Sequence, residues 1–168
     1  ATQLIMSRAP PGAAWTASAC VEPSDGEPSI KLEKAEDVAD VIEKLTAKLC
    51  EREGGAFSTT AAVVIKLRSP DVPDLTLLDL PGIVRTAVAG QSQSVIGDVN
   101  SLIETYLKQE RTVVLAVIPA NQDVATIDIL QKAKGADPEG ARTIAVLTKP
   151  DLIDQGAEKE VLETLLNK

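Results

Sequence analysis

Polar or charged side chains follow three strongly apolar runs of this sequence at the point where each run ends. The segments concerned are Asp79 to Gly82, Pro119 to Asp123 and Thr148 to Asp151. Such apolar runs are typical of strands in a parallel sheet, and open parallel sheets bind ligands beyond the carboxyl ends of their strands. We therefore expect the three segments to lie at one edge of a sheet and to form a ligand site.

Asp79 and Gly82 have the types and the spacing of the acidic element of a nucleoside triphosphatase. An Asp at a strand end can hold Mg²⁺ through water, because Mg²⁺ keeps several waters and takes few protein ligands. A glycine three residues later lets a backbone N–H approach a terminal phosphate without a side chain in the way. A simple turn after a strand explains the same residues, so this segment alone leaves both interpretations open.

Thr148, Lys149, Pro150 and Asp151 have the form of a guanine-reading loop. A carboxylate can accept hydrogen bonds from N1–H and from the exocyclic amino group of guanine, a donor pair that adenine lacks. Charge-assisted bonds of this kind contribute roughly 1.5–3 kcal/mol each, and a lysine stem can lie along the face of the base. A turn at the start of a helix, with Pro and Asp in common positions, is the alternative explanation.

The two segments together indicate more than either does alone. Each follows an apolar run, and Asp79 lies 72 positions before Asp151. Two expected helices and one strand lie between Asp79 and the apolar run that precedes Thr148. The sequence contains no histidine, which excludes a Ser-His-Asp triad, a Cys-His pair and any zinc site that needs imidazole. Chemistry here must use carboxylates, hydroxyls, lysine, backbone amides or a hard metal ion.

Composition sets further limits on the function. The chain has 168 residues, enough for one ordinary domain, and a net charge of −8, which argues against binding nucleic acid or anionic lipid through its own surface. It has neither an 18-residue apolar run nor the pattern of a signal peptide. Cys20 and Cys50, without a CxxC motif, are expected to be reduced thiols of a cytosolic protein.

The spacing of apolar residues predicts the elements that position these segments. Strands are predicted over 4–6, 15–21, 61–67, 75–78, 113–118 and 143–147, and helices over 35–50, 94–109, 124–134 and 157–167. We expect strands 61–67 and 75–78 to pair as a hairpin. Strands 75–78, 113–118 and 143–147 alternate with helices, which predicts a parallel sheet with right-handed crossovers, the last two strands being buried on both faces.

At this point the sequence resembles the dynamin-like large GTPases, a family that includes the Mx proteins. The resemblance lies in the stretches Ser69 to Ile83, Leu115 to Asp123 and Asp137 to Leu152. The Asp-Pro-x-Gly-x-Arg-Thr-Ile run before Thr148 is typical of this family and is not shared with small Ras-like GTPases. Because the resemblance is strong over 60–168 and weak over 1–59, residues 1–168 are interpreted as one partial dynamin-type G domain.

The resemblance implies an α/β fold, the P-loop GTPase-type three-layer sandwich with a mostly parallel central sheet, truncated at both ends. The phosphate-binding run Gly-x-x-x-x-Gly-Lys-Ser/Thr does not occur among these residues. The first strand, the phosphate loop and the switch threonine are therefore expected before Ala1, and the second guanine-contacting loop beyond Lys168. Such a piece would expose apolar faces and open strand edges, so we expect it to be marginally stable or to aggregate alone.

The resemblance also implies roles for the residues of the nucleotide site. Asp79 would act on Mg²⁺ through water, and Asp79 and Gly82 would serve catalysis at the terminal phosphate. Asp79, Pro81 and Gly82 would belong to the nucleotide-binding set, as would the guanine-reading residues Thr148, Lys149 and Asp151.

Two further carboxylates lie where this family makes contacts between paired G domains. They are Asp123 and Asp154, and for Asp123 the capping of a helix is an equal explanation.

The function that the resemblance implies is Mg²⁺-dependent GTP hydrolysis, in which water attacks the terminal phosphate in the complete protein, while this fragment alone is expected to be inactive. The partners implied are other copies of the protein, through G-domain pairing, and membranes or microtubules, through regions outside this chain. We also expect a role in membrane remodelling, a cytoplasmic location that is peripheral on membranes, and no binding of nucleic acid.

Three alternatives remain open at this point. The chain could be a non-catalytic, truncated G-domain fragment that acts as an interaction module or is a relic. Another P-loop GTPase class is less well supported, because such proteins usually carry Asn at the position of Thr148 and lack the Asp-Pro-x-Gly run. An ATPase is disfavoured by Asp151.

Overall fold

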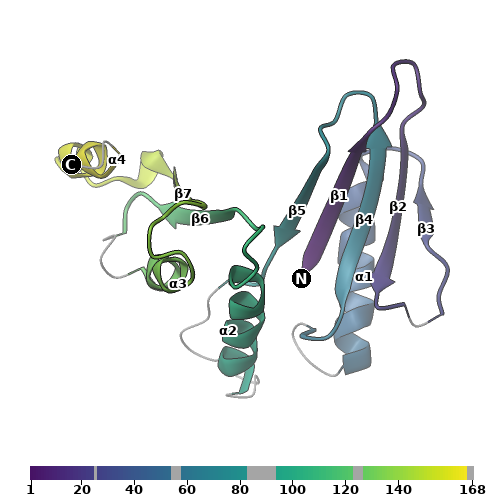
Figure 1. Cartoon of the computed structure of the whole chain (residues 1–168), viewed down its shortest axis with the longest axis horizontal. Helices are drawn as coiled ribbons and strands as arrows, with labels where there is room; N and C mark the ends of the chain where they lie inside the picture. Colours follow the sequence, from purple (N-terminus) through teal and green to yellow (C-terminus); the bar gives the residue numbers. More distant parts are fainter. Residues whose placement is uncertain (25, 54–57, 83–93, 123–126, 166–168) are drawn as a thin grey trace. The chain divides into compact units, whose positions relative to one another are not determined.

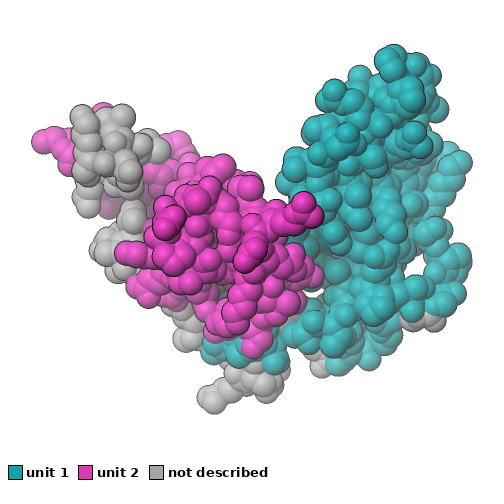
Figure 2. All heavy atoms as spheres, in the orientation of Figure 1, with its two compact units in different colours: residues 1–99 teal, residues 100–168 magenta. Residues whose placement is uncertain are grey.

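The computed structural model describes residues 1–24, 26–53, 58–82, 94–122 and 127–165. They form two compact units, residues 1–99 and residues 100–168 (Figure 2). The elements in chain order are β1 Thr2–Arg8, β2 Thr16–Glu22, β3 Ile30–Leu32, α1 Asp37–Glu53, β4 Ala62–Ser69, β5 Leu75–Asp79, α2 Ser94–Leu107, β6 Val114–Pro119, α3 Asp128–Ala136, β7 Thr143–Thr148, the 3₁₀ turn η2 Pro150–Leu152 and α4 Glu158–Leu165 (Figure 1). Among the described residues, no helix is both long and apolar enough to span a membrane.

The predicted elements are confirmed in type, with shifted ends. The α/β class is confirmed as well. The short strand β3 was not predicted, because three residues are too few to produce a periodic pattern. The Gly54-Gly55 pair, expected to end the first helix, lies outside the described residues, as do residues 124–126 of the predicted third helix.

The first unit contains a five-stranded mixed sheet in the order β3-β2-β4-β1-β5. The β1–β4 pair is parallel, whereas β1–β5, β2–β3 and β2–β4 are antiparallel. Figure 1 shows α1 lying along one face of this sheet, where it contacts β2 and β4. Figure 1 views the sheet from the opposite face.

The expected hairpin between residues 61–67 and 75–78 is wrong. β1 lies between β4 and β5 and pairs with both, so that Leu4 is opposite Ile65 on one side and Leu77 on the other. The apolar run at the start of the chain, Leu4-Ile5-Met6, can bury both of its edges only inside a sheet. This non-local pairing replaces the local one that the short connection at Ser69 to Pro73 suggested.

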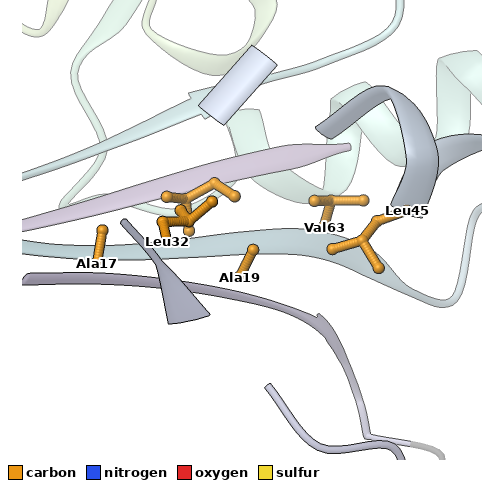
Figure 3. Close-up of a cluster of buried hydrophobic side chains, with 6 residues drawn as sticks. Ala17, Ala19, Leu32, Leu45 and Val63 are labelled. Carbon is orange, nitrogen blue, oxygen red and sulfur yellow. The ribbon is translucent and has the colours of Figure 1, made fainter. Parts of the chain in front are cut away.

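The core of the first unit lies between the sheet and α1. Buried side chains from four elements meet there: Ala17 and Ala19 of β2, Leu32 of β3, Leu45 of α1, and Val63 and Ile65 of β4. Figure 3 shows Leu45 next to Val63, which joins the helix to the middle of the sheet. The apolar spacing of α1 thus positions the helix over β4, the strand that leads to the β5 segment.

In the second unit, β6 and β7 form a parallel two-stranded sheet, and α3 contacts β6. Parallel pairing of these two strands was predicted and is confirmed. The expected third member of that sheet, β5, pairs instead with β1 in the first unit, antiparallel.

Burial on both faces, predicted for β6 and β7, is not observed. Ala116 and Ile118 are fully covered, whereas Leu115 and Val117 between them are 54% and 58% exposed. On β7 the side chain opposite Leu115, Ile144, is 53% exposed. The described residues cover only one face of this sheet, so its other face presents a row of large apolar side chains to solvent.

The turn between α3 and β7 is held by a buried aspartate. The Asp137 carboxylate accepts hydrogen bonds from the backbone N–H groups of Ala141 and Arg142 at 3.0 and 2.9 Å, and from the Thr143 hydroxyl at 2.7 Å. The Thr143 hydroxyl, and next the Arg142 backbone N–H, hold the pKa of the Asp137 carboxyl below its ordinary value. Gly140, at φ +65°, supplies the left-handed turn residue.

The Arg142 side chain joins this turn to the ends of two helices. Its guanidinium donates to the carbonyl of Leu107, the last residue of α2, at 2.7 Å and to that of Ala136, the last residue of α3, at 3.0 Å. A third bond reaches the Thr112 carbonyl, before β6, at 3.0 Å. The motif from Asp137 to Thr143 therefore fixes where β7 begins relative to β6, α2 and α3.

Candidate nucleotide-binding site

The carboxyl ends of β6 and β7 meet, as the sequence predicts. Pro119 lies opposite Thr148 in the register of the two strands. The backbone N–H of Ala120 donates to the Thr148 carbonyl at 2.7 Å, and the Thr148 hydroxyl donates to the Ile118 carbonyl at 3.1 Å. Thr148 therefore holds the two strand ends together from both its main chain and its side chain.

The backbone turns sharply directly after this anchor. Lys149 has φ +55° and ψ +49°, the left-handed region, and is the non-glycine residue with positive φ among those the structure describes. Pro150 then starts the turn η2, which is closed by a 3.0 Å bond from the Leu152 N–H to the Lys149 carbonyl. A left-handed lysine is strained by about 1–2 kcal/mol, and such strain is concentrated at functional sites.

The loop presents its chemically useful groups to solvent. Lys149 and Asp151 are exposed, whereas Thr148 is half-buried. An exposed carboxylate three residues beyond the Thr148 anchor is free to accept hydrogen bonds from a ligand. The Thr148 hydroxyl proton, in contrast, is used within the protein, so this residue positions the loop.

The segment after β5 lies in the first unit, and each unit is described here by itself. Asp79 is the last residue of β5, lies opposite Thr2 of β1 and is exposed. Pro81 is half-buried and Gly82 is exposed. A Cβ added to Gly82 would meet no atom within 4 Å, and its φ is not positive. Packing and backbone conformation in the described residues therefore do not require glycine there, as expected if the requirement comes from a ligand.

Asp79 fits a Mg²⁺ ion that is held mainly by waters and substrate phosphates, and does not fit one that is enclosed by protein side chains. The described residues contain no cluster of three or more acidic or sulfur side chains able to enclose a metal ion. Mg²⁺ bound for phosphate chemistry is commonly held by one or two carboxylates, waters and the substrate phosphates. A single exposed carboxylate at a strand end suits that arrangement.

The two carboxylates assigned to G-domain contacts are placed differently. Asp154 is exposed in the segment after η2, three residues beyond Asp151, and its carbonyl accepts the Ala157 N–H at 3.0 Å. Asp123 lies outside the described residues, so its role stays a prediction.

Two features of the site were missed from the sequence. The left-handed conformation of Lys149 has no sequence signal, because lysine is not a residue that favours it. The anchor formed by Asp137 and Arg142 does have one: Asp-Pro at the end of a helix, followed by Arg-Thr just before an apolar strand. The motif was noted, but its hydrogen bonds were not predicted.

Comparison with known proteins shows the family of this chain. Residues 4–150 match the model of the dynamin family, the N-terminal part named Dynamin_N, and the chain therefore belongs to this family. An interferon-induced GTP-binding protein Mx of Perca fluviatilis is 42% identical over 134 residues, 79% of this chain and 44% of that protein. Mx3 of Oncorhynchus mykiss is 42% identical over 137 residues, 81% of this chain and 22% of that protein.

A mammalian relative shares a shorter and more similar region. Mx2 of Sus scrofa is 50% identical over 105 residues, 62% of this chain and 15% of that protein. This chain thus spans less than half the length of each of these relatives.

Proposed function

We propose that the polypeptide containing these residues binds and hydrolyses GTP, and that residues 1–168 are part of its dynamin-type G domain. The observation that carries this proposal is the β6–β7 edge, where the Thr148 anchor and the left-handed Lys149 present an exposed Asp151. Membership of the dynamin family supports it, as do relatives whose names describe them as GTP-binding.

Different residues of this chain bind the base and the phosphates. Asp151 accepts hydrogen bonds from guanine, and the Lys149 stem lies along the base. Gly82 brings its N–H to the terminal phosphate, and Asp79 orients the water shell of a Mg²⁺ ion. When bound, that ion supplies positive charge against the charge that develops on the phosphate oxygens.

The phosphate-binding run is not among residues 1–168, so turnover is proposed for the polypeptide that includes one. The first experiment reads the coding sequence on the 5′ side of the Ala1 codon. A Gly-x-x-x-x-Gly-Lys-Ser/Thr run followed by a threonine in the next loop supports the enzyme. Transcription that starts near the Ala1 codon contradicts it and favours a non-catalytic interaction module.

Replacing Asp151 by Asn tests the base assignment directly. Asn keeps one acceptor for N1–H but turns a donor toward the guanine amino group, whereas xanthine offers an oxygen there. We expect GTP affinity to fall by about 100-fold and xanthosine triphosphate binding to appear. Titration with fluorescent analogues of both nucleotides measures this, with Asp40→Asn, at an exposed position of α1, as the matched control. Loss of GTP binding without a gain of xanthosine triphosphate binding would contradict the assignment.

Further parts of this proposal concern partners. Asp123 and Asp154 contact the paired G domain of a second copy, and the full-length protein works in the cytoplasm on membranes or microtubules through other regions. Sedimentation of that protein with a transition-state analogue of GTP, compared with an Asp154→Arg variant, tests the pairing. Unchanged dimerisation in the variant would remove Asp154 from the contact.

A further inference from the structure

The face of the five-stranded sheet opposite α1 carries a group of basic side chains. The register aligns Lys31 of β3 with Ser18 of β2, and Ser18 with Lys66 of β4. The next row aligns Thr16 of β2 with Arg68 of β4. We call the set Lys31, Lys66 and Arg68, with the hydroxyls of Thr16 and Ser18 on β2 between them and that of Ser7 beside Arg68 on β1, the basic face. Together they line a shallow depression of about 250 Å³.

The basic face is unusual for this protein. The whole chain has 25 acidic and 17 basic residues, yet three cations stand here within two strand spacings. Lys66 and Arg68 lie two residues apart on one strand, about 7 Å, and Lys31 lies two strands from Lys66, about 10 Å. Like charges at these separations repel one another, so folding alone does not favour the grouping.

Among the residues that the structure describes, one carboxylate compensates these charges. Glu22 accepts a hydrogen bond from the Lys66 ammonium at 2.6 Å. The side chains of Lys31 and Arg68 have no hydrogen bond or ion pair with any described residue. The depression therefore keeps two uncompensated cations, both exposed, beside hydroxyls that can also donate.

The donor set and its spacing fit a particular ligand chemistry. Ammonium, guanidinium and hydroxyl groups all donate to oxygen acceptors, and the charges favour anionic ones. An extended segment with carboxylates on alternate residues repeats them about every 7 Å, the same spacing as Lys66 and Arg68. A single small anion would meet one or two of these donors in an open depression.

The overall charge selects among anionic partners. A nucleic acid or an anionic membrane is a large, dense polyanion that a protein of net charge −8 repels. A short acidic segment senses mainly the charges within a Debye length of about 8–10 Å, which here are the cations of the basic face. We propose that the basic face docks a short acidic segment of a partner protein.

The test measures binding of a fluorescein-labelled peptide of alternating glutamate and threonine to the full polypeptide that contains residues 1–168. A peptide of alternating lysine and threonine is the control probe. The double variant Lys31→Glu/Arg68→Glu should weaken binding of the glutamate peptide by about tenfold. The matched variant Lys44→Glu/Arg111→Glu makes the same charge change at exposed positions outside the basic face and should change affinity by less than about twofold.

A third variant should strengthen binding. Glu22 already forms an ion pair with Lys66. Glu22→Gln removes this ion pair and should increase the affinity for the glutamate peptide by about threefold. Circular dichroism confirms that each variant keeps its fold. Equal weakening by both double variants, absent binding of the glutamate peptide, weaker binding by Glu22→Gln, or tighter capture of anionic vesicles or single-stranded DNA would each overturn the proposal.

Discussion

Lys149 holds the most unusual backbone conformation of the described residues, and it does so beside the exposed carboxylate of Asp151. Left-handed backbone is unfavourable for any residue with a Cβ, and the turn η2 begins only one residue later. The conformation directs the chain away from the strand end at once, so that Asp151 does not continue the line of β7. The left-handed conformation of Lys149 lowers stability, which is consistent with a lysine side chain that serves ligand binding.

Substitution at Lys149 should separate stability from binding. Lys149→Gly removes the unfavourable Cβ and should be about 1 kcal/mol more stable than Lys149→Ala, which keeps it. Both variants lack the lysine stem and should bind guanine nucleotide more weakly than the parent. Urea unfolding gives the first comparison and fluorescence titration the second. A glycine variant less stable than the alanine variant would contradict the left-handed assignment.

At the scale of elements, the Arg142 side chain connects three segments of the second unit. Its bonds to Leu107, Thr112 and Ala136 satisfy carbonyls at two helix ends and at the approach to β6. Helix ends leave such carbonyls without intrahelical partners, and a planar guanidinium can serve several at once. The spacing of α2, α3 and β7 therefore depends on one side chain.

Arg142→Lys should lower the free energy of unfolding by about 2 kcal/mol, because an ammonium cannot reach all three carbonyls. Arg111→Lys, at an exposed position whose side chain makes no hydrogen bond or ion pair with a described residue, should change it by less than about 0.5 kcal/mol. Urea denaturation of both variants, followed by circular dichroism, measures the difference. Similar values for the two would show that the helix ends are held by packing instead.

Element types could be predicted from the sequence because the apolar patterns of α1, α2 and the strands are long and regular. The parallel pairing of β6 with β7 was predicted as well, but the pairing of β1 could not be, since β1 has no local signal that it lies between β4 and β5. For the site, the positions after β6 and β7 followed from strand order alone. The Thr148 anchor and the left-handed Lys149 depend on backbone geometry that residue types do not encode.

At the scale of the whole molecule, the β6–β7 sheet has one covered face and one apolar face in solvent. Strands in parallel sheets are usually covered on both faces, and large exposed apolar patches promote association. Leu115, Val117 and Ile144 supply the exposed row. The stability and solubility of the protein should therefore depend on what covers that face of the sheet.

Two neighbouring valines test this view. Val117→Thr, at a side chain 58% exposed, should leave stability nearly unchanged and reduce binding of an apolar fluorescent dye. Val114→Thr, at a side chain 7% exposed, should lower stability by about 1–3 kcal/mol because it buries a hydroxyl. Dye fluorescence, sedimentation and thermal unfolding give the three readouts. Equal dye binding by Val117→Thr and the parent would place the apolar surface elsewhere.

The place of β1 between β4 and β5 determines when it can pair during synthesis on the ribosome. Thr2–Arg8 leaves the exit tunnel before either of its partners, and β5 is complete only when Asp79 has been added. At about 5–20 residues per second, this delay lasts roughly 4–14 seconds. For most of that interval, until Ser69 completes β4, Leu4, Ile5 and Met6 have no partner strand. The nascent segment is therefore a natural client for chaperones that hold extended apolar chain.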